Sequence, residues 1–352
     1  MSNRAAKEEN RTGKHDGAAP AAPAKRGYLH DITIAKGLGI FLVVLGHVVT
    51  GEPPKGNDWY AMMRTALYAF HMPFFIYLSG FIFFYTASHL KAWQGFWSFF
   101  ARRAERLLVP FALFGLIIVV GKHVASAFIH VDNLAPNFAT DLVNLFWNTG
   151  ESAAKSVWYV FVLFEMTLFA VIAMRLVKSP LFWFVIAVPL SFVPMVPVLY
   201  LDRFFLYLPY FFVGGLAIAR SDGWGRMMDR WLWLWLVVFA GVIVATRMAG
   251  IYNLSLIACG LASIPALHGI CRLPVVQRVK WLDLLGRYSF PIYLLNTVCI
   301  GLAKGLLLLV MPWDGVNFLI FLPVLLAAGI VGPIAAKVLI FRRSAYIDKI
   351  TD

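Results

Sequence analysis

Two residues with reactive side chains share one face of the first apolar segment. His47 lies near the end of the run from Ile32 to Thr50, and Lys36 lies eleven residues before it. At 100° per residue this spacing is about three helical turns, which places both side chains on one face, about 16 Å apart along the axis. Ionisable groups inside a membrane-spanning helix cost about 3 kcal/mol each and normally face protein or a water-filled cavity. The pair therefore predicts an active site with a base and a cation.

A second histidine, His71, lies in the stretch from Phe70 to Phe81, which also contains Ser79. If this segment crosses the membrane in the opposite direction, His71 reaches about the depth of His47 and the two histidines can meet. A polar residue at a helix start is an equally good interpretation of His71. Pro73 suits the first turn of a helix, and Ser79-Gly80 allows a neighbouring backbone to approach closely, so neither feature requires a catalytic explanation.

Two arginines stand at the predicted cytoplasmic end of the third apolar run. On a helix, Arg103 and Arg106 are i,i+3 neighbours with Cβ atoms about 5–6 Å apart, a spacing that suits phosphate oxygens. They are therefore candidates for binding an anionic cofactor at the inner surface. An arginine cluster at this place also marks membrane orientation or contact with lipid headgroups.

The fourth run carries Trp158 and Glu165 on one helical face, with Glu165 near mid-membrane. A carboxylate at that depth must pair with a cation or be protonated, and Lys122 and Lys304 are candidate partners. We expect Glu165 to support or line the site rather than to catalyse.

In the ninth run, Ser289, Tyr293 and Asn296 follow i, i+4, i+7 spacing and form one polar face. This face predicts either a cavity wall or hydrogen bonds between helices.

The composition identifies the medium in which these residues work. Of the 352 residues, 61% are hydrophobic and 14% are charged, and the mean hydropathy is +0.75. A soluble domain has about 25% charged residues, so the chain is predicted to be an all-α polytopic membrane protein. Segments of about 20 residues per crossing give about ten transmembrane helices. The runs are Ile32–Thr50, Ala66–Ala87, Leu107–Ile129, Val157–Val177, Leu181–Tyr200, Phe204–Ala219, Trp231–Met248, Ile251–Cys271, Ser289–Val310 and Val316–Ile340.

The net charge of +13 reflects topology rather than nucleic-acid binding. If the amino terminus is cytoplasmic, 22 of the 31 lysines and arginines fall in inside segments, and only five fall in outside connections. This positive-inside pattern predicts that both termini are cytoplasmic. Residues 1–27 are polar and predicted to be a disordered tail. Residues 28–343 form the transmembrane domain, and residues 344–352 form a short cytoplasmic tail. The three cysteines lack paired spacing and no metal is expected.

Taken together, these motifs resemble the integral-membrane acyltransferase 3 family, which O-acylates glycans and includes a fucose 4-O-acetylase-like branch. The resemblance extends from about Tyr28 to Arg343. The residues that carry it are Lys36 with His47, the stretch Phe70–Phe81, Arg103 with Arg106 and Pro110, Trp158-Tyr159-Val160, Tyr207–Arg220, and Leu285–Tyr293.

The resemblance implies a mechanism and roles for these residues. Acyl-CoA, most simply acetyl-CoA, would donate its acyl group to a sugar hydroxyl. Arg103 and Arg106 would bind the CoA phosphates, and Lys36 would contact the CoA on its path toward His47. His47 would act as general base or accept the acyl group, and His71 and Ser79 would line the site. The chain departs from the family that it resembles at one position, because many members look to have a histidine where this chain has Asn296. Asparagine carries no proton at neutral pH, so a proton-transfer role is not expected there.

The expected function is therefore O-acyl transfer from cytoplasmic acyl-CoA to an envelope glycan, an exopolysaccharide precursor or a lipid-linked oligosaccharide. The expected location is the bacterial inner membrane, with membrane lipid around the protein. The alternatives are a transporter or flippase of a glycosylated or anionic lipid, and a membrane scaffold whose polar residues only join helices. One connected cavity containing His47, His71 and the two arginines would favour the enzyme. The sequence does not indicate an oligomeric state.

Overall fold

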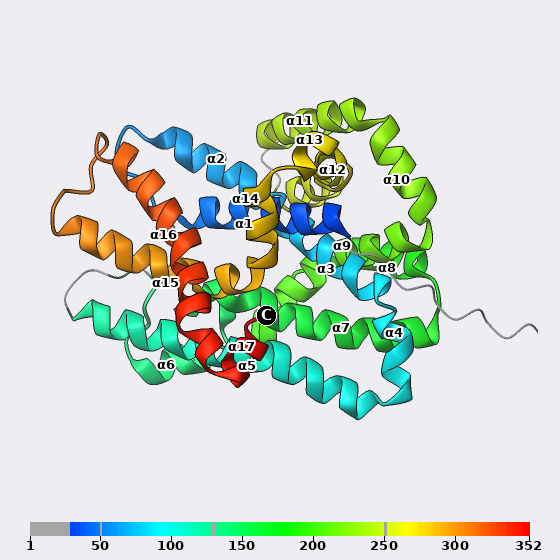
Figure 1. Ribbon diagram of the computed structural model, residues 1–352, viewed down its shortest axis with the longest axis horizontal. Helices are drawn as coiled ribbons and strands as arrows, with labels where there is room; N and C mark the ends of the chain where they lie inside the picture. The colour runs from blue at the N-terminus through cyan, green and yellow to red at the C-terminus, as the bar shows by residue number, and fades with distance from the viewer. Residues whose placement is uncertain (1–28, 50, 128–130, 132, 250–251) are drawn as a thin grey trace, which may run out of the picture.

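The computed structural model describes residues 29–49, 51–127, 131, 133–249 and 252–352 (Figure 1). The predicted disordered tail, residues 1–27, lies outside the described residues. All regular elements in the described part are helices. The longer ones are α1 (His30–His47), α2 (Asp58–Tyr68), α3 (His71–Tyr85), α5 (Phe96–Ser126), α7 (Trp158–Leu176), α8 (Pro180–Leu190), α9 (Leu201–Ala219), α10 (Ser221–Arg230), α11 (Leu232–Ala249), α12 (Tyr252–Arg272), α15 (Ser289–Leu308) and α16 (Phe318–Leu339).

Short helices join or flank them. These are α4 (Ser88–Lys91), α6 (Phe138–Asn144), α13 (Pro274–Gln277), α14 (Lys280–Arg287) and α17 (Ala345–Ile350), with the single turns η1 (Ala92–Gln94), η2 (Thr149–Glu151), η3 (Lys155–Val157), η4 (Val198–Tyr200) and η5 (Phe341–Arg343).

Among the described residues, eight helical stretches are long and apolar enough to cross a membrane. A ninth results if α10 and α11, bent by 77° at their junction, are counted as one span. The bend falls after Arg230, in a basic connection, and not in the middle of an apolar run. The prediction of an all-α polytopic membrane protein is therefore confirmed.

The predicted fifth crossing differs from the structure. Its helix, α8, covers only 11 residues and ends at Leu190. The apolar run contains Pro189, Pro194 and Pro197. Proline lacks the N–H that a helix interior needs and clashes with the preceding turn, and three prolines within nine residues accompany the end of the helix at Leu190.

Close helix contacts fix the depth of α1, which packs against α3, α12, α14 and α15 (Figure 1). A Cβ on Gly37 would lie 2.0 Å from the carbonyl oxygen of Leu282, and a Cβ on Gly286 would lie 2.0 Å from that of Thr33. The two glycines therefore let the backbones of α1 and α14 touch. Because Lys36 is next to Gly37, this contact also sets the position of Lys36.

A second glycine contact joins α3 to α9. A Cβ on Gly80 would lie 2.1 Å from the carbonyl oxygen of Phe211, and one on Gly214 would lie 2.2 Å from the backbone nitrogen of Phe81. The predicted role of Ser79-Gly80 in close helix approach agrees with this geometry.

The chain end is a packed element. The predicted tail, residues 344–352, contains α17, which lies against α5 (Figure 1). The ammonium of Lys337 in α16 is 3% exposed and lies 2.8 Å from Asp348 and 2.6 Å from Asp352. Lys349 pairs with Glu105 of α5 at 2.7 Å. These pairs attach α17 to α16 and α5.

Candidate active site

His47 is the last residue of α1 and is half-buried. Its Nδ1 lies 2.8 Å from Oδ1 of Asn296 in α15. The amide nitrogen of Asn296 donates to the carbonyls of Ile292 and Tyr293, at 2.9 and 2.8 Å. Since both amide protons are used within α15, Oδ1 must be the atom that faces His47, and it can only accept. His47 therefore carries its proton on Nδ1, and its Nε2 lone pair is the basic site.

Polar side chains of α2 hold the end of α1 that presents His47. Tyr60 Oη donates to the carbonyl of Leu45 at 2.6 Å, and Tyr68 Oη donates to that of Gly46 at 3.0 Å. Arg64 donates to the carbonyl of Val49 at 2.7 Å. The last carbonyls of a helix have no partner within the helix, so these bonds stabilise the final turn. The sequence analysis did not identify these three residues.

His71 begins α3 and is buried, with 3% of its surface exposed. Its Nδ1 donates to the carbonyl of Leu67 at 2.6 Å, which leaves Nε2 as the acceptor. Its ring lies 5.1 Å from that of Tyr68. His47 is close enough for a charge on either histidine to act on the other. The structure thus brings the two histidines together, and His71 is the more enclosed of the pair.

Three cations gather at the other end of α1. Lys36 is half-buried and has no hydrogen bond or ion pair among the described residues. It lies within electrostatic range of Arg106, which in turn is near Arg103. Arg103 contacts no carboxylate in the described part of the chain, and Arg106 contacts the terminal carboxylate of Asp352. Like charges repel, so three cations with only this one acidic contact favour an anion.

The two arginines do not form a fork over one point. Arg103 reaches toward Ser88 Oγ at 3.4 Å and lies over the ring of Phe99, with its guanidinium carbon 5.4 Å from the centroid. Arg106 donates to the terminal carboxylate of Asp352 at 2.9 Å. Arg103 and Arg106 could bind the same anion only if it carried two separate phosphates, or if one of the two side chains moved.

Residues 29–338 match the family described as an acyltransferase domain, acyltransferase 3. The chain belongs to the acyltransferase 3 family. Within this family member, Lys36 and His47 lie on α1 and the arginine pair lies on α5, as the resemblance in the sequence implied.

The acyltransferase 3 chain is also similar to two curated proteins, both named nodulation protein NolL. It is 32% identical to that of Sinorhizobium fredii over 144 residues, which are 37% of this chain and 38% of the relative. It is 24% identical to that of Mesorhizobium japonicum over 235 residues, or 64% of this chain and 57% of the relative. The chain thus spans about two fifths to three fifths of these relatives' length. No solved structure matches it.

A hydrogen-bonded chain connects Ser79 with Tyr293. Ser79 Oγ donates to the carbonyl of Phe75 at 3.0 Å and lies 2.5 Å from Tyr159 Oη. The backbone N–H of Tyr159 donates to Tyr293 Oη at 3.0 Å, and that hydroxyl donates to the carbonyl of Ser156 at 2.5 Å. Tyr293 precedes Asn296 by one turn, so this chain ends beside the partner of His47. Ser79 and Tyr293 therefore join helices here, and so does Tyr159, which the sequence analysis named only as part of a motif and not as a site residue.

Trp158 and Glu165 lie on α7, which packs against α9, and the Trp158 ring lies beside that of Tyr159, with centroids 6.3 Å apart. Glu165 pairs with neither of its expected partners, and that expectation is wrong. Lys122 donates to the carbonyl of Asn133 at 3.5 Å, and Lys304 lies 4.2 Å from the ring centroid of Trp313. Long lysine side chains near helix ends reach the membrane surface, so these ammonium groups turn to the loops and not to mid-membrane.

A polar network at the start of α1 was not predicted. Tyr77 Oη lies 2.8 Å from His268 Nδ1, and His268 Nε2 lies 3.4 Å from Asp31. Arg272 donates to Asp31 at 3.2 Å and binds Asp229 through two bonds of 2.8 Å. All members have partners, so the network joins α1, α3, α10 and α12. The signals in the sequence were His268, an ionisable residue inside the run Ile251–Cys271, and Asp31, directly before the run Ile32–Thr50.

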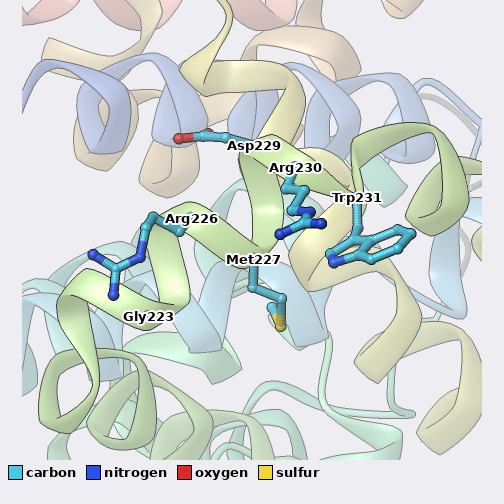
Figure 2. A pocket seen from close by; sticks show the side chains of 6 residues that line it. All are labelled: Gly223, Arg226, Met227, Asp229, Arg230 and Trp231. Atoms are coloured by element: carbon cyan, nitrogen blue, oxygen red, sulfur yellow. The ribbon is translucent and has the colours of Figure 1, made fainter.

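A surface hollow of about 450 Å³ lies on α10 (Figure 2). Arg226, Arg230 and Trp231 line it, and the guanidinium carbon of Arg230 is 5.5 Å from the Trp231 ring centroid. It contains none of the predicted site residues. Among the described residues there is also no group of three or more histidine, cysteine or acidic side chains that could hold a metal ion.

Proposed function

We propose that the chain is a membrane O-acyltransferase that moves an acyl group, most simply acetyl, from cytoplasmic acyl-CoA to a hydroxyl of an envelope glycan. The acceptor class includes exopolysaccharide precursors and lipid-linked oligosaccharides, and the proposed location is the bacterial inner membrane. The observation that carries the proposal is the arrangement on α1. His47 presents a basic Nε2 near one end, and unpaired Lys36 lies about 16 Å away with the arginines beside it.

Each end of α1 has a separate task in the proposed reaction. The CoA phosphates bind Lys36, Arg103 and Arg106, and the extended pantetheine arm carries the thioester toward His47. His47 Nε2 takes the proton of the acceptor hydroxyl while the hydroxyl oxygen attacks the thioester carbonyl. The carbon–sulfur bond then breaks, and the departing CoA sulfur takes the proton from His47.

Asn296 orients His47 without adding a charge. A carboxylate in this place would stabilise the imidazolium, as in serine hydrolase triads, whereas the amide only fixes the tautomer and the ring direction. This suits a base that holds the proton briefly and returns it to the leaving sulfur. His71, with its own Nε2 free to accept, lies beside this path.

The decisive experiment compares membranes containing wild-type protein, His47→Ala and His30→Ala with radiolabelled acetyl-CoA. Label is followed into the envelope glycan fraction. General-base catalysis contributes about 10²–10⁴-fold, so His47→Ala should lose transfer by that factor at equal protein level. His30, a partly exposed histidine at the other end of α1, is the matched control and should retain transfer. Full transfer by His47→Ala would refute the assignment, and absence of transfer by wild type would call for succinyl-CoA before transport assays.

A further inference from the structure

A cluster of polar and aromatic side chains lies between α7 and α9, near the start of each helix. Its members are Trp158, Glu165, Tyr200, Asp202, Arg203 and Tyr207. Trp158 and Tyr207 stack with centroids 5.0 Å apart and planes inclined by 24°. The guanidinium carbon of Arg203 lies 5.3 Å from the Trp158 ring centroid, and Arg203 Nε donates to Asp202 at 3.3 Å. Aromatic and charged contacts thus hold these residues in fixed positions.

Three polar atoms of this cluster are buried without a hydrogen-bond partner among the described residues. They are Oε2 of Glu165, the hydroxyl of Tyr200 and Oδ1 of Asp202. The Tyr200 side chain is also nearly inaccessible, since the residue is 2% exposed. About 90% or more of buried polar groups in proteins have a partner, so three neighbouring exceptions require an explanation.

The backbone itself is arranged to turn Tyr200 inward. Leu199 and Tyr200 have φ angles of 52° and 58°, the left-handed region that non-glycine residues rarely adopt. The N–H of Leu199 donates to the carbonyl of Phe146 at 2.7 Å, which anchors the turn. A strained turn that places an unpartnered hydroxyl inside the protein is typical of functional sites.

The charges of the cluster indicate what it binds. Glu165 and Asp202 are close enough for their carboxylates to repel. A buried carboxyl without a cationic partner keeps its proton, and a tyrosine hydroxyl both donates and accepts, so Glu165 and Tyr200 offer donors as well as acceptors, and Asp202 offers an acceptor. The ligand that fits must therefore supply both donors and acceptors. Hydroxyl groups on a sugar ring are neutral donors and acceptors in fixed positions, and Arg203 beside them can donate to ring or hydroxyl oxygens.

The cluster is adjacent to the proposed reaction site. Tyr200 and Arg203 lie within electrostatic range of Tyr293. Tyr293 Oη in turn donates to Ser156, directly before α7, and lies one helical turn before Asn296, the partner of His47. A sugar held by the cluster can therefore extend a neighbouring hydroxyl toward His47.

We propose that Glu165, Tyr200 and Asp202 form the subsite that binds one hydroxylated sugar ring of the acceptor, with Arg203 and Trp158 as its rigid support. The proposal rests on the proposed function, because it assigns the acceptor half of that reaction. It separates the protein into a donor end, at the three cations, and an acceptor end, at this cluster.

The test is a kinetic comparison in membranes with acetyl-CoA and de-O-acylated envelope glycan isolated from a host strain that lacks the protein. The variants are Glu165→Gln, Tyr200→Phe and Asp202→Asn, with Asp58→Asn, an exposed carboxylate at the start of α2, as the matched control. Each cluster variant should raise the KM for glycan by about tenfold, the usual cost of one lost hydrogen bond to a ligand. The KM for acetyl-CoA and the glycan-independent hydrolysis of acetyl-CoA should stay unchanged.

Stability measurements distinguish this role from a structural one. Because the Tyr200 hydroxyl has no partner within the described protein, removing it in Tyr200→Phe should leave the thermal midpoint in detergent unchanged or raise it. A lowered midpoint with an unchanged glycan KM would overturn the proposal. So would equal rises in the KM for glycan and for acetyl-CoA. If wild type transfers no label, the proposed function fails and this subsite fails with it, whereas transfer with normal glycan KM in all variants overturns the subsite alone.

Discussion

At the scale of single residues, the site depends on atoms whose roles are fixed by their hydrogen bonds. A histidine becomes a directed base only when one nitrogen is committed, and Asn296 commits Nδ1 of His47 because its own amide protons are already used in α15. Lys36, toward the opposite end of α1, has no acidic partner in the described structure. Its ammonium is therefore available to an anion.

Replacing Asn296 by leucine should lower kcat by about ten- to a hundredfold, the effect of a lost hydrogen bond of about 1–3 kcal/mol on the reacting geometry. The KM for acyl-CoA should change little, since the phosphates bind at the other end of α1. Steady-state kinetics in membranes provide the measurement, and Asn296→Asp, which keeps an acceptor oxygen, is the matched control. An unchanged kcat in Asn296→Leu would mean that the tautomer of His47 does not limit the reaction.

Replacing Lys36 by methionine should raise the KM for acetyl-CoA by about tenfold or more, because a charge-assisted bond to phosphate is lost. The same variant should use acetyl-pantetheine as well as wild type does, since that thioester lacks the nucleotide phosphates. Arg102→Ala, an exposed arginine one residue before Arg103, is the control and should leave both KM values unchanged. If the KM rose equally for acetyl-CoA and for acetyl-pantetheine, Lys36 would act in the acyl-transfer step and not in binding the nucleotide phosphates.

At the scale of helices, the sequence predicts the spans well and their contacts poorly. Apolar runs predict where α1, α5, α7, α15 and α16 lie, because the length of a membrane crossing dictates their length. The failure at α8 arises from proline, which shortens a helix without interrupting the apolar run. The clamp of Tyr60, Arg64 and Tyr68 on the end of α1 could not be predicted, since it depends on how α2 folds back over α1.

The contact between α3 and α9 gives a prediction at this scale. Gly80→Ala would place a Cβ 2.1 Å from a backbone oxygen of Phe211, so the two helices must separate. Overpacking of this kind costs about 1–3 kcal/mol, and the thermal midpoint in detergent should fall. Gly301→Ala, in α15, has nothing within 4 Å of the added Cβ and should be neutral or slightly stabilising. Equal midpoints for the two variants would show that the contact is loose.

At the scale of the whole molecule, the candidate site is assembled from helices far apart in the chain. Spacing within α1 was enough to associate Lys36 with His47, but the approach of Asn296 from α15 and of the C-terminal residues to Arg106 involves separations of about 250 residues. Such pairings follow from the packing of the complete bundle and leave no periodic signal in the sequence. This is also why the buried network around His268 and the turn at Tyr200 were found only in the structure.

The place of His47, between a cytoplasmic anion-binding end and an outer sugar-binding end, makes the proposed reaction vectorial. The proton of the acceptor hydroxyl moves inward to the CoA sulfur while the acyl group moves outward, and the substrate and product on each side carry the same charge. One turnover therefore moves no net charge through the membrane field, although a single charge crossing it would be worth about 2.3 kcal/mol per 100 mV. In sealed vesicles with the potential clamped by potassium and valinomycin, the transfer rate should stay the same when the sign of the potential is reversed. A rate that rises when the cytoplasmic side is negative would mean that a charged group moves in the rate-limiting step.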